Sequence, residues 1–323
     1  MKYRTLIIGC GNIAGSLDDN EINSNRPPLT HAKAYKNSQN FDLIACIDSN
    51  QKNLSKFQKQ WSINQGFLSF EKAISKKIQV DVVSICSPTN YREEHLDLAL
   101  SLNPKLVFCE KPLHFDFLAA KKLIKKYKDN NVHLQVNYNR RFDPSILHFK
   151  ESLKSNKYGR LRAIRGWYNK GLLNNGSHCL DLLISLFGKL DLKYVGKGIN
   201  DYDDQDLSYP LLLSAQKDVP ITLSCGNAND FSLVELEFLF SKGRIKMLNG
   251  GRNWSIENIV PDSTFKGYKI LSDINYTDGQ YLQSFSNAVS NIQKCLSQHE
   301  KLISSGEEAL KVLKLYSEIL ERT

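Results

Sequence analysis

Short apolar runs alternate with helix-like segments over the first 140 residues, and this alternation constrains the fold most strongly. Runs that are apolar at nearly every position are typical of parallel strands covered on both faces. Helical spacing between such runs predicts a doubly wound α/β sheet. The predicted strands are Tyr3–Ile8, Leu43–Ile47, Val80–Cys86, Leu106–Cys109 and Val132–Val136. The helical segments between them are Asn50–Trp61, Phe70–Lys76, Glu93–Leu102 and Phe115–Lys128.

The pattern changes after about Arg141. Two helical segments are interleaved with short strand-like runs that polar turns separate, which predicts a mostly antiparallel sheet with helices on one face. A chain of 323 residues also exceeds what one core usually supports. We therefore expect two domains, an α/β domain over residues 1–140 and an α+β domain with an open sheet over residues 141–323.

A glycine-rich turn directly follows the first predicted strand. It reads Gly9-Cys10-Gly11-Asn12-Ile13-Ala14, the G-x-G-x-x-A pattern in which backbone approaches a pyrophosphate. Asp48 ends the second long strand, where an acidic side chain binds ribose hydroxyls and repels a 2′-phosphate. No Arg follows Asp48, so NAD is favoured over NADP. An ordinary strand-to-helix turn is the alternative interpretation.

The spacing from this turn to Asp48 is longer than the roughly 20 residues of the usual fingerprint. The excess is the polar stretch 16–28, SLDDNEINSNRPP, which is too polar for a packed helix. We expect it to be a loop inserted between the glycine turn and a helix at about Leu29–Lys36.

Two further motifs carry chemistry. Lys111, within Glu110-Lys111-Pro112, follows a parallel strand and would point into the crevice where ligands bind. The alternative is a surface lysine in a turn. Asn174, His178 and Asp181 recur at helical spacing in LLNNGSHCLD and would share one helix face. The alternative there is helix capping by Asn174 or Asn175 and a core histidine paired with Asp181.

Together these motifs resemble the glucose-fructose oxidoreductase/inositol dehydrogenase/rhizopine catabolism (Gfo/Idh/MocA) oxidoreductases over nearly the whole chain. The matching segments are GCGNIAG, ACIDSN, VVSICSPTNYREEHLDLAL, LVFCEKPL, NYNRRFDP and NNGSHCLDLL. The resemblance implies a Rossmann domain followed by a substrate-binding and oligomerisation domain. It also implies a cofactor site formed by Gly9, Gly11, Asn12, Ile13, Asp48, Ser87, Pro88, Glu110 and Lys111.

The family resemblance implies that Lys111 lies near the nicotinamide and that His178 is the acid–base group for the substrate hydroxyl. Two positions depart from the family pattern. Asn174 stands where Asp is usual, and an amide cannot stabilise an imidazolium by charge. Arg92 stands where many relatives have His, and it either faces a phosphate or carboxylate or is exposed. His95 occupies another position that is often His.

The expected activity is therefore NAD-linked hydride transfer to or from a secondary alcohol of a sugar, a sugar derivative or a nucleotide-linked sugar. Lys111, His178 and Asn174 would serve catalysis. A redox-assisted elimination with tightly bound NAD and a catalytically silent, NAD-binding regulatory protein are the alternatives. The nearest candidates for substrate contact are Tyr168, Lys170, Asp181 and Arg92.

Composition and charge indicate which partners and which cellular compartment to expect. The net charge of +9 comes from scattered Lys and Arg without a nucleic-acid motif, so we expect no nucleic-acid partner. No apolar run is long enough for a membrane helix, and the N-terminus does not resemble a signal peptide. Seven cysteines without a C-x-x-C pair predict reduced thiols, a cytoplasmic protein and no metal site. Apolar residues on both faces of the strand near Tyr209–Ser214 predict a homodimer or homotetramer.

Overall fold

The protein is described from a computed structural model, which covers residues 2–20 and 24–323. The chain divides into two compact units. The first comprises Met1–Phe142 and Leu282–Leu313, and the second Asp143–Tyr281 and Lys314–Thr323. The sequence predicted one boundary at residue 140 and a single C-terminal domain. The observed division differs from this prediction because Leu282–Leu313 return to the first unit.

Helix α8 (Ser284–Gln298) accounts for that return. Its residues Phe285, Val289 and Ile292 are buried in the same hydrophobic cluster as Tyr35 and Phe108 of the first unit. Burying such an apolar helix face removes several large side chains from water, which stabilises the unit by about 2 kcal/mol for each.

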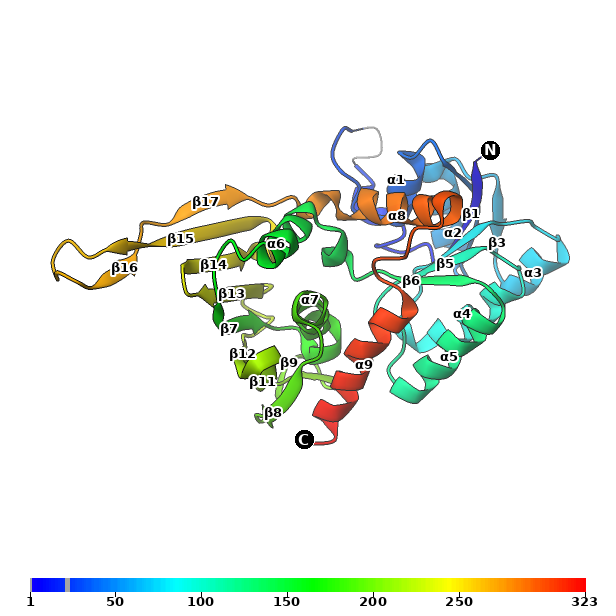
Figure 1. Ribbon diagram of the computed structural model, residues 1–323. Coiled ribbons are helices and arrows are strands. Elements are labelled where there is room, and N and C mark those ends of the chain that lie inside the picture. Colours follow the sequence, from blue (N-terminus) through cyan, green and yellow to red (C-terminus); the bar gives the residue numbers. More distant parts are fainter. Residues whose placement is uncertain (1, 21–23) are drawn as a thin grey trace. The chain divides into compact units, whose positions relative to one another are not determined.

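The first unit contains a parallel sheet in the order β3-β2-β1-β4-β5-β6 (Figure 1). The side chains of Val82, Val83 and Ile85 in its centre are fully buried, as expected for a strand covered on both faces. The predicted doubly wound sheet is therefore confirmed. The strands are β1 (Tyr3–Ile8), β2 (Phe41–Ile47), β3 (Gln65–Phe67), β4 (Val82–Ile85), β5 (Leu106–Cys109) and β6 (His133–Val136).

Helices of this unit begin where polar side chains cap them. Thr30, Asn50 and Asp116 each accept a hydrogen bond from a backbone N–H in the first turn of the following helix. Capping of this kind fixes where α1, α2 and α5 start along the chain. The helices are α1 (His31–Lys36), α2 (Gln51–Trp61), α3 (Phe70–Ser75), α4 (Arg92–Leu100) and α5 (Phe117–Asp129).

The second unit is formed around a sheet in the order β16-β15-β14-β13-β7-β12-β11-β8, with β17 also paired to β15. Among the described strands of this sheet, only β7 and β12 are parallel neighbours, so the predicted mostly antiparallel sheet is confirmed. The strands are β7 (Leu161–Tyr168), β8 (Asp191–Val195), β11 (Leu211–Ala215), β12 (Val219–Cys225), β13 (Val234–Phe240), β14 (Gly243–Leu248), β15 (Asn253–Pro261), β16 (Lys269–Leu271) and β17 (Asn275–Asp278).

The two faces of this sheet differ. Helices α6 (Pro144–Lys154) and α7 (Ser177–Phe187) belong to the apolar face, where the Phe149 ring lies 4.9 Å from Phe238 and 5.5 Å from Trp254. The opposite face carries ion pairs such as Arg244 with Glu257, 2.7 Å apart. Helix α9 (Gly306–Leu320) ends the chain.

Several strands were absent from the sequence prediction. The hairpin of β9 (Ile199–Asp203) and β10 (Asp206–Ser208) is separate from the main sheet. Strands β15, β16 and β17 form an arm that projects from the rest of the second unit (Figure 1). Strands β9, β10 and β17 are rich in Asn and Asp, so they lack the apolar alternation that marks a half-buried strand, and β16 has only three residues.

In the described part of the chain, none of the helices is both long enough and apolar enough to cross a lipid bilayer.

Candidate active site

The glycine turn leaves β1 with the geometry that its residue types predict. Gly9 has a φ of +83°, and a Cβ there would come within 2.8 Å of the Ser87 backbone nitrogen. A Cβ on Gly11 would meet nothing within 4 Å, so open space lies over this residue. The turn therefore combines one glycine required by backbone packing with a second that leaves room for a ligand.

The helix that should follow this turn is split by the inserted loop. The N–H of His31 donates to the carbonyl of Ile13 over 3.2 Å, and that of Ala32 donates to Ala14 over 2.9 Å. Helix α1 thus continues the turn after the glycines as though the intervening residues were absent. Without the loop, the spacing to Asp48 is close to the usual ~20 residues, which resolves the discrepancy in the sequence. Residues 21–23 of this stretch lie outside the described residues.

Asp48 holds the glycine turn against the end of β2. Its Oδ2 accepts from the Cys10 N–H at 2.7 Å, and its Oδ1 accepts from the Asn50 N–H at 2.8 Å. Each carboxylate oxygen can accept a second hydrogen bond. Asp48 can therefore position the turn and still bind a ribose hydroxyl of a dinucleotide.

Glu110 is buried beside Lys111 and accepts hydrogen bonds from two directions. His31 Nε2 lies 2.9 Å from its Oε1, and Asn137 Nδ2 donates to the same oxygen over 2.6 Å. Burial raises the pKa of Glu110, but the bonds from His31 and Asn137 and the charge of Lys111 outweigh it, and the pKa is lowered. Glu110 is thus a fixed carboxylate, and it anchors the segment that carries Lys111. The roles of His31 and Asn137 were not predicted, since His31 lies in no motif and the sequence assigned no role to Asn137, the first residue of the segment NYNRRFDP.

Arg92 differs from both interpretations that its position allowed. It is 2% exposed, so the exposed interpretation is wrong. Its Nη1 donates to the carbonyls of Glu110 and Pro112, and its Nη2 donates to the carbonyl of Ser87 over 2.7 Å. Because these donors serve the backbone, the predicted substrate contact by Arg92 is not supported. Arg92 instead holds together the two loops that follow β4 and β5.

His95 provides a further link in this region. Its Nδ1 lies 2.7 Å from the Ser87 hydroxyl, and burial lowers its pKa. The lowered pKa therefore favours a neutral His95 imidazole, hydrogen-bonded to the Ser87 hydroxyl, at physiological pH.

One cleft of about 940 Å³ in the first unit collects these features. Every residue predicted to bind the cofactor lines it, and these residues come from four separate segments of the chain. They are Gly9, Gly11, Asn12, Ile13, Asp48, Ser87, Pro88, Glu110 and Lys111. The cleft has the size expected of a pocket for a large small-molecule ligand, and its glycine turn and the Asp48 carboxylate fit a dinucleotide.

The histidine motif belongs to the second unit and opens differently from the prediction. Residues Gly171–Gly176 form a π-helical turn, and α7 begins at Ser177. The expected regular α-helical spacing from Asn174 to His178 is therefore changed by the wider turn. The N-cap of α7 is Gly176, so neither Asn174 nor Asn175 occupies the N-cap position. His178 is 9% exposed and Asp181 is 1% exposed.

Two other candidates precede this motif. Tyr168 is fully buried, and its hydroxyl donates to the Tyr209 carbonyl and accepts from the Tyr209 N–H, each over 2.8 Å. The predicted substrate contact by Tyr168 is thus wrong, because the hydroxyl is committed to the backbone. Lys170 has a φ of +67°, and its Nζ lies 4.5 Å from the centre of the Tyr202 ring.

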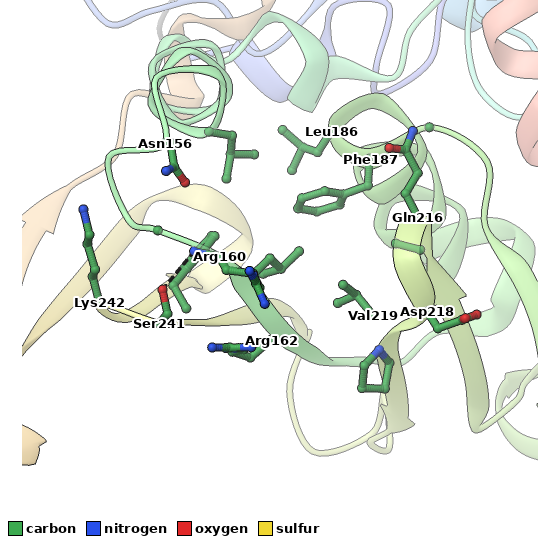
Figure 2. A pocket seen from close by; sticks show the side chains of 17 residues that line it. Asn156, Arg160, Arg162, Leu186, Phe187, Gln216, Asp218, Val219, Ser241 and Lys242 are labelled. Carbon is green, nitrogen blue, oxygen red and sulfur yellow. Dashed lines mark hydrogen bonds between the residues drawn. The ribbon is translucent and has the colours of Figure 1, made fainter.

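A larger cavity of about 1270 Å³ in the second unit contains none of the predicted site residues. Figure 2 shows Leu186 and Phe187, at the C-terminal end of α7, lining it together with Arg160 and Arg162 of the β7 region. His178 is near the opposite end of α7, which is about 15 Å long. Cavity size alone therefore does not locate the histidine motif.

Within residues 2–20 and 24–323, no cluster of three or more His, Cys, Asp or Glu side chains is arranged to hold a metal ion.

The glycine turn, the acidic end of β2 and the cleft define a Rossmann-type dinucleotide-binding protein. Comparison with known proteins agrees. Residues 3–138 match the model of the oxidoreductase family with an NAD-binding Rossmann fold, GFO_IDH_MocA. Residues 3–138 therefore carry the NAD-binding Rossmann domain of the Gfo/Idh/MocA oxidoreductase family, and the chain is an oxidoreductase.

Similarity to individual proteins extends beyond the first unit. The chain is 23% identical over 321 residues to an inositol 2-dehydrogenase of Rhizobium meliloti, covering 91% of this chain and 93% of that protein. The crystal structure of the WlbA dehydrogenase from Bordetella pertussis, in complex with NADH and UDP-GlcNAcA, has a TM-score of 0.76 at 16% identity. The match covers 100% of this chain and 96% of the WlbA chain. KijD10, a 3-ketoreductase from Actinomadura kijaniata crystallised with NADP, has a TM-score of 0.78 at 17% identity, with coverages of 100% and 98%. At identities this low, the two structural matches establish the shared fold alone.

Proposed function

We propose that the protein uses NAD to oxidise or reduce a secondary alcohol of a sugar-like substrate, such as an inositol, a free sugar or a nucleotide-linked sugar. The observation that carries the proposal is the cleft that gathers the whole predicted cofactor site around Gly11 and Asp48. Of the named relatives, one is an inositol 2-dehydrogenase and another was crystallised with a nucleotide-linked sugar, which supports this substrate class.

The chemistry of the site follows from its own residues. The nicotinamide cofactor, when bound, accepts or donates the hydride. Lys111 is held at the cofactor cleft beside buried Glu110, and its role is to stabilise the developing charge on the substrate oxygen. His178 takes or returns the hydroxyl proton, and Asn174 orients the imidazole or the substrate through its amide.

Asp48 selects the cofactor. Its carboxylate is fixed by the Cys10 and Asn50 N–H groups at the edge of the cleft, so it cannot easily move away from a 2′-phosphate. This favours NAD over NADP, even though a protein of similar fold was crystallised with NADP. The free thiols of all seven cysteines support a cytoplasmic location.

Incubation of the protein with NAD and a panel of free, acidic and nucleotide-linked sugars, read at the NADH absorbance band, tests the activity. Lys111→Ala and His178→Ala should each reduce turnover by ~10²–10⁴ with smaller effects on NAD affinity. A His178→Ala variant within a few-fold of the wild type would show that this histidine is structural. Consumption of a sugar without net NADH, by protein that retains NAD, would instead indicate a redox-assisted elimination.

We also propose that the chain forms a homodimer or homotetramer through the face of the second unit's sheet opposite α6 and α7. Leu212 is 38% exposed and pairs in register with Tyr194, which is 62% exposed. Toward β13 and β14 the same face carries ion pairs, including Arg165 with Glu237 at 3.2 Å. Light scattering should give a dimer or tetramer mass for the wild type and a smaller mass for Leu212→Glu. A monomeric wild type at micromolar concentration would contradict this.

A further inference from the structure

The β9–β10 hairpin carries two aspartates that bind the backbone of the histidine motif. Asp206 accepts from the Leu173 N–H with Oδ1 and from the Asn174 N–H with Oδ2, each over 2.8 Å. Both oxygens of one carboxylate therefore hold consecutive peptide groups at the start of the π-helical turn. Charge-assisted bonds of this kind are roughly twice as strong as bonds between neutral groups.

The same hairpin holds Lys170, which precedes this turn, and Gly171, its first residue. Asp201, which is 2% exposed, accepts from the Lys170 N–H over 2.7 Å. Ser208 accepts from the Gly171 N–H over 3.0 Å and donates to Asp201 over 2.8 Å. Asp201 also accepts from the Ala228 N–H over 3.2 Å, so it joins the hairpin to a second loop.

The motif needs such support because its own backbone does not supply it. A helix start leaves N–H groups without intrahelical partners, and a negative charge near them is favourable. No side chain caps the π-helical turn at Lys170 or α7 at Gly176 among the described residues. The hairpin provides the missing acceptors from a distant part of the sequence.

The close approach also explains a glycine in the motif. Gly171 has a φ of +83°, and a Cβ there would collide with the Asp206 carboxylate. The positive φ values of Lys170 and Gly171 direct the chain into the turn directly beneath the hairpin. The turn and the hairpin thus fit one another in backbone conformation as well as in hydrogen bonding.

We propose that Asp206, supported by Asp201, is a positioning residue that fixes the Asn174–His178 segment in its working conformation. The proposal rests on the proposed function, since it assigns His178 the proton-transfer role. In this arrangement the Asp206 carboxylate accepts from the backbone N–H of Asn174, a residue whose own side chain is an amide. Loss of the Asp206 bonds should let residues 170–176 open locally while the cofactor cleft of the first unit is unaffected.

The test compares Asp206→Asn, Asp206→Ala and a matched control, Asp204→Asn. Asp204 is an exposed acid at the turn of the same hairpin, so its replacement removes the same charge from the same element. At position 206 the wild type, Asp206→Asn and Asp206→Ala offer two, one and no acceptor oxygens, respectively. Amide hydrogen exchange of residues 170–176 and NAD binding by calorimetry are measured on the full chain.

In Asp206→Ala the amides of Leu173 and Asn174 should exchange at least about tenfold faster, since two charge-assisted bonds are lost. Asp206→Asn should lie between this variant and the wild type. The control should match the wild type, and NAD affinity should stay within about twofold throughout. On the sugar that the wild type turns over, kcat and kcat/KM should fall together by about tenfold or more in Asp206→Ala, with partial recovery in Asp206→Asn.

Unchanged exchange at residues 170–176 in Asp206→Ala would overturn the proposal. So would equal effects of the Asp204→Asn control, or faster exchange together with turnover within twofold of the wild type. If Asp206→Ala does not fold, Asp206→Asn tests the same bonds more mildly, and Ser208→Ala removes the neighbouring bond from the Gly171 N–H. The exchange measurement requires no substrate, so failure of the proposed function would appear separately, as absence of turnover in the wild type.

Discussion

Replacing Asp18 by Ala should destabilise the first unit far more than replacing its neighbour Asp19. Asp18 and Lys33 both have fully buried side chains, with Nζ and Oδ1 4.0 Å apart. Asp18 Oδ2 also accepts from the Leu29 N–H over 3.0 Å and from the Thr30 hydroxyl over 2.7 Å. The carboxylate therefore anchors the end of the inserted loop and compensates a buried charge.

The magnitude follows from what remains after the change. Asp18→Ala leaves the buried Lys33 ammonium without this carboxylate, while the neutral Ser24 hydroxyl still accepts a hydrogen bond from it over 3.2 Å. Removing one member of a buried ion pair typically costs about 3–5 kcal/mol. Asp19 pairs with Lys56 at 2.6 Å, but that lysine is 59% exposed. An exposed pair contributes about 0–1 kcal/mol, so Asp19→Ala is the matched control.

Hydrogen exchange of the β1 amides measures this loss for the first unit alone. A single denaturation midpoint would mix two units that need not unfold together. Asp18→Ala should lower the opening free energy by about 3–5 kcal/mol, and Asp19→Ala by less than about 1 kcal/mol. Adding Lys33→Met to Asp18→Ala should restore part of the loss, because the buried charge is then gone. Equal effects of the two single alanine variants would refute this reasoning.

Three further outcomes follow from the cofactor cleft and its sheet. Asp48→Ala should narrow the preference for NAD over NADP, measured as a ratio of dissociation constants; equal wild-type affinities would contradict the role of Asp48. Burial raises the pKa of Asp81, but hydrogen bonds from Arg4 and the charge of Lys105 outweigh it and lower the pKa to about 2. Asp81 therefore contributes about 2 kcal/mol of stability above pH ~5 that is lost as the pH falls toward 2, and Asp81→Asn should flatten acid unfolding over that range. Arg92→Lys should weaken NAD binding and lower the melting temperature, because one ammonium cannot reproduce the planar fork that holds three carbonyls; unchanged NAD affinity would show that these loops keep their conformation without it.

The cofactor cleft could be predicted because its information is local. Gly9, Gly11 and Asp48 each follow an apolar strand, and strand ends of a parallel sheet meet at one edge. Lys111 follows by the same reasoning. The inserted loop was also recognisable, because its polar composition interrupts an otherwise regular pattern.

The support of the histidine motif could not be predicted in this way. Asp201 and Asp206 lie in a polar stretch, NDYDDQDLS, that has no strand periodicity and resembles an ordinary loop. Their bonds to residues 170–174 join positions about thirty residues apart, and no local pattern records such a pairing. Tyr168 and Arg92 were misplaced for a related reason: a polar side chain near a motif is as suitable for binding backbone as for binding a ligand.

Because of the inserted loop, residues that follow one another in the helical hydrogen-bond ladder are not neighbours in the chain. Ala14 is followed in the helical ladder by residues at the start of α1, although residues 15–30 separate them covalently. We therefore expect the covalent connection to be dispensable at this point, since the hydrogen bonds to Ile13 and Ala14 and those to Asp18 hold its two sides together. A protease site introduced after Asn25 should yield two fragments that remain associated as one Rossmann unit. The loop is accordingly a natural place to split the protein, or to insert a reporter, without disturbing the glycine turn.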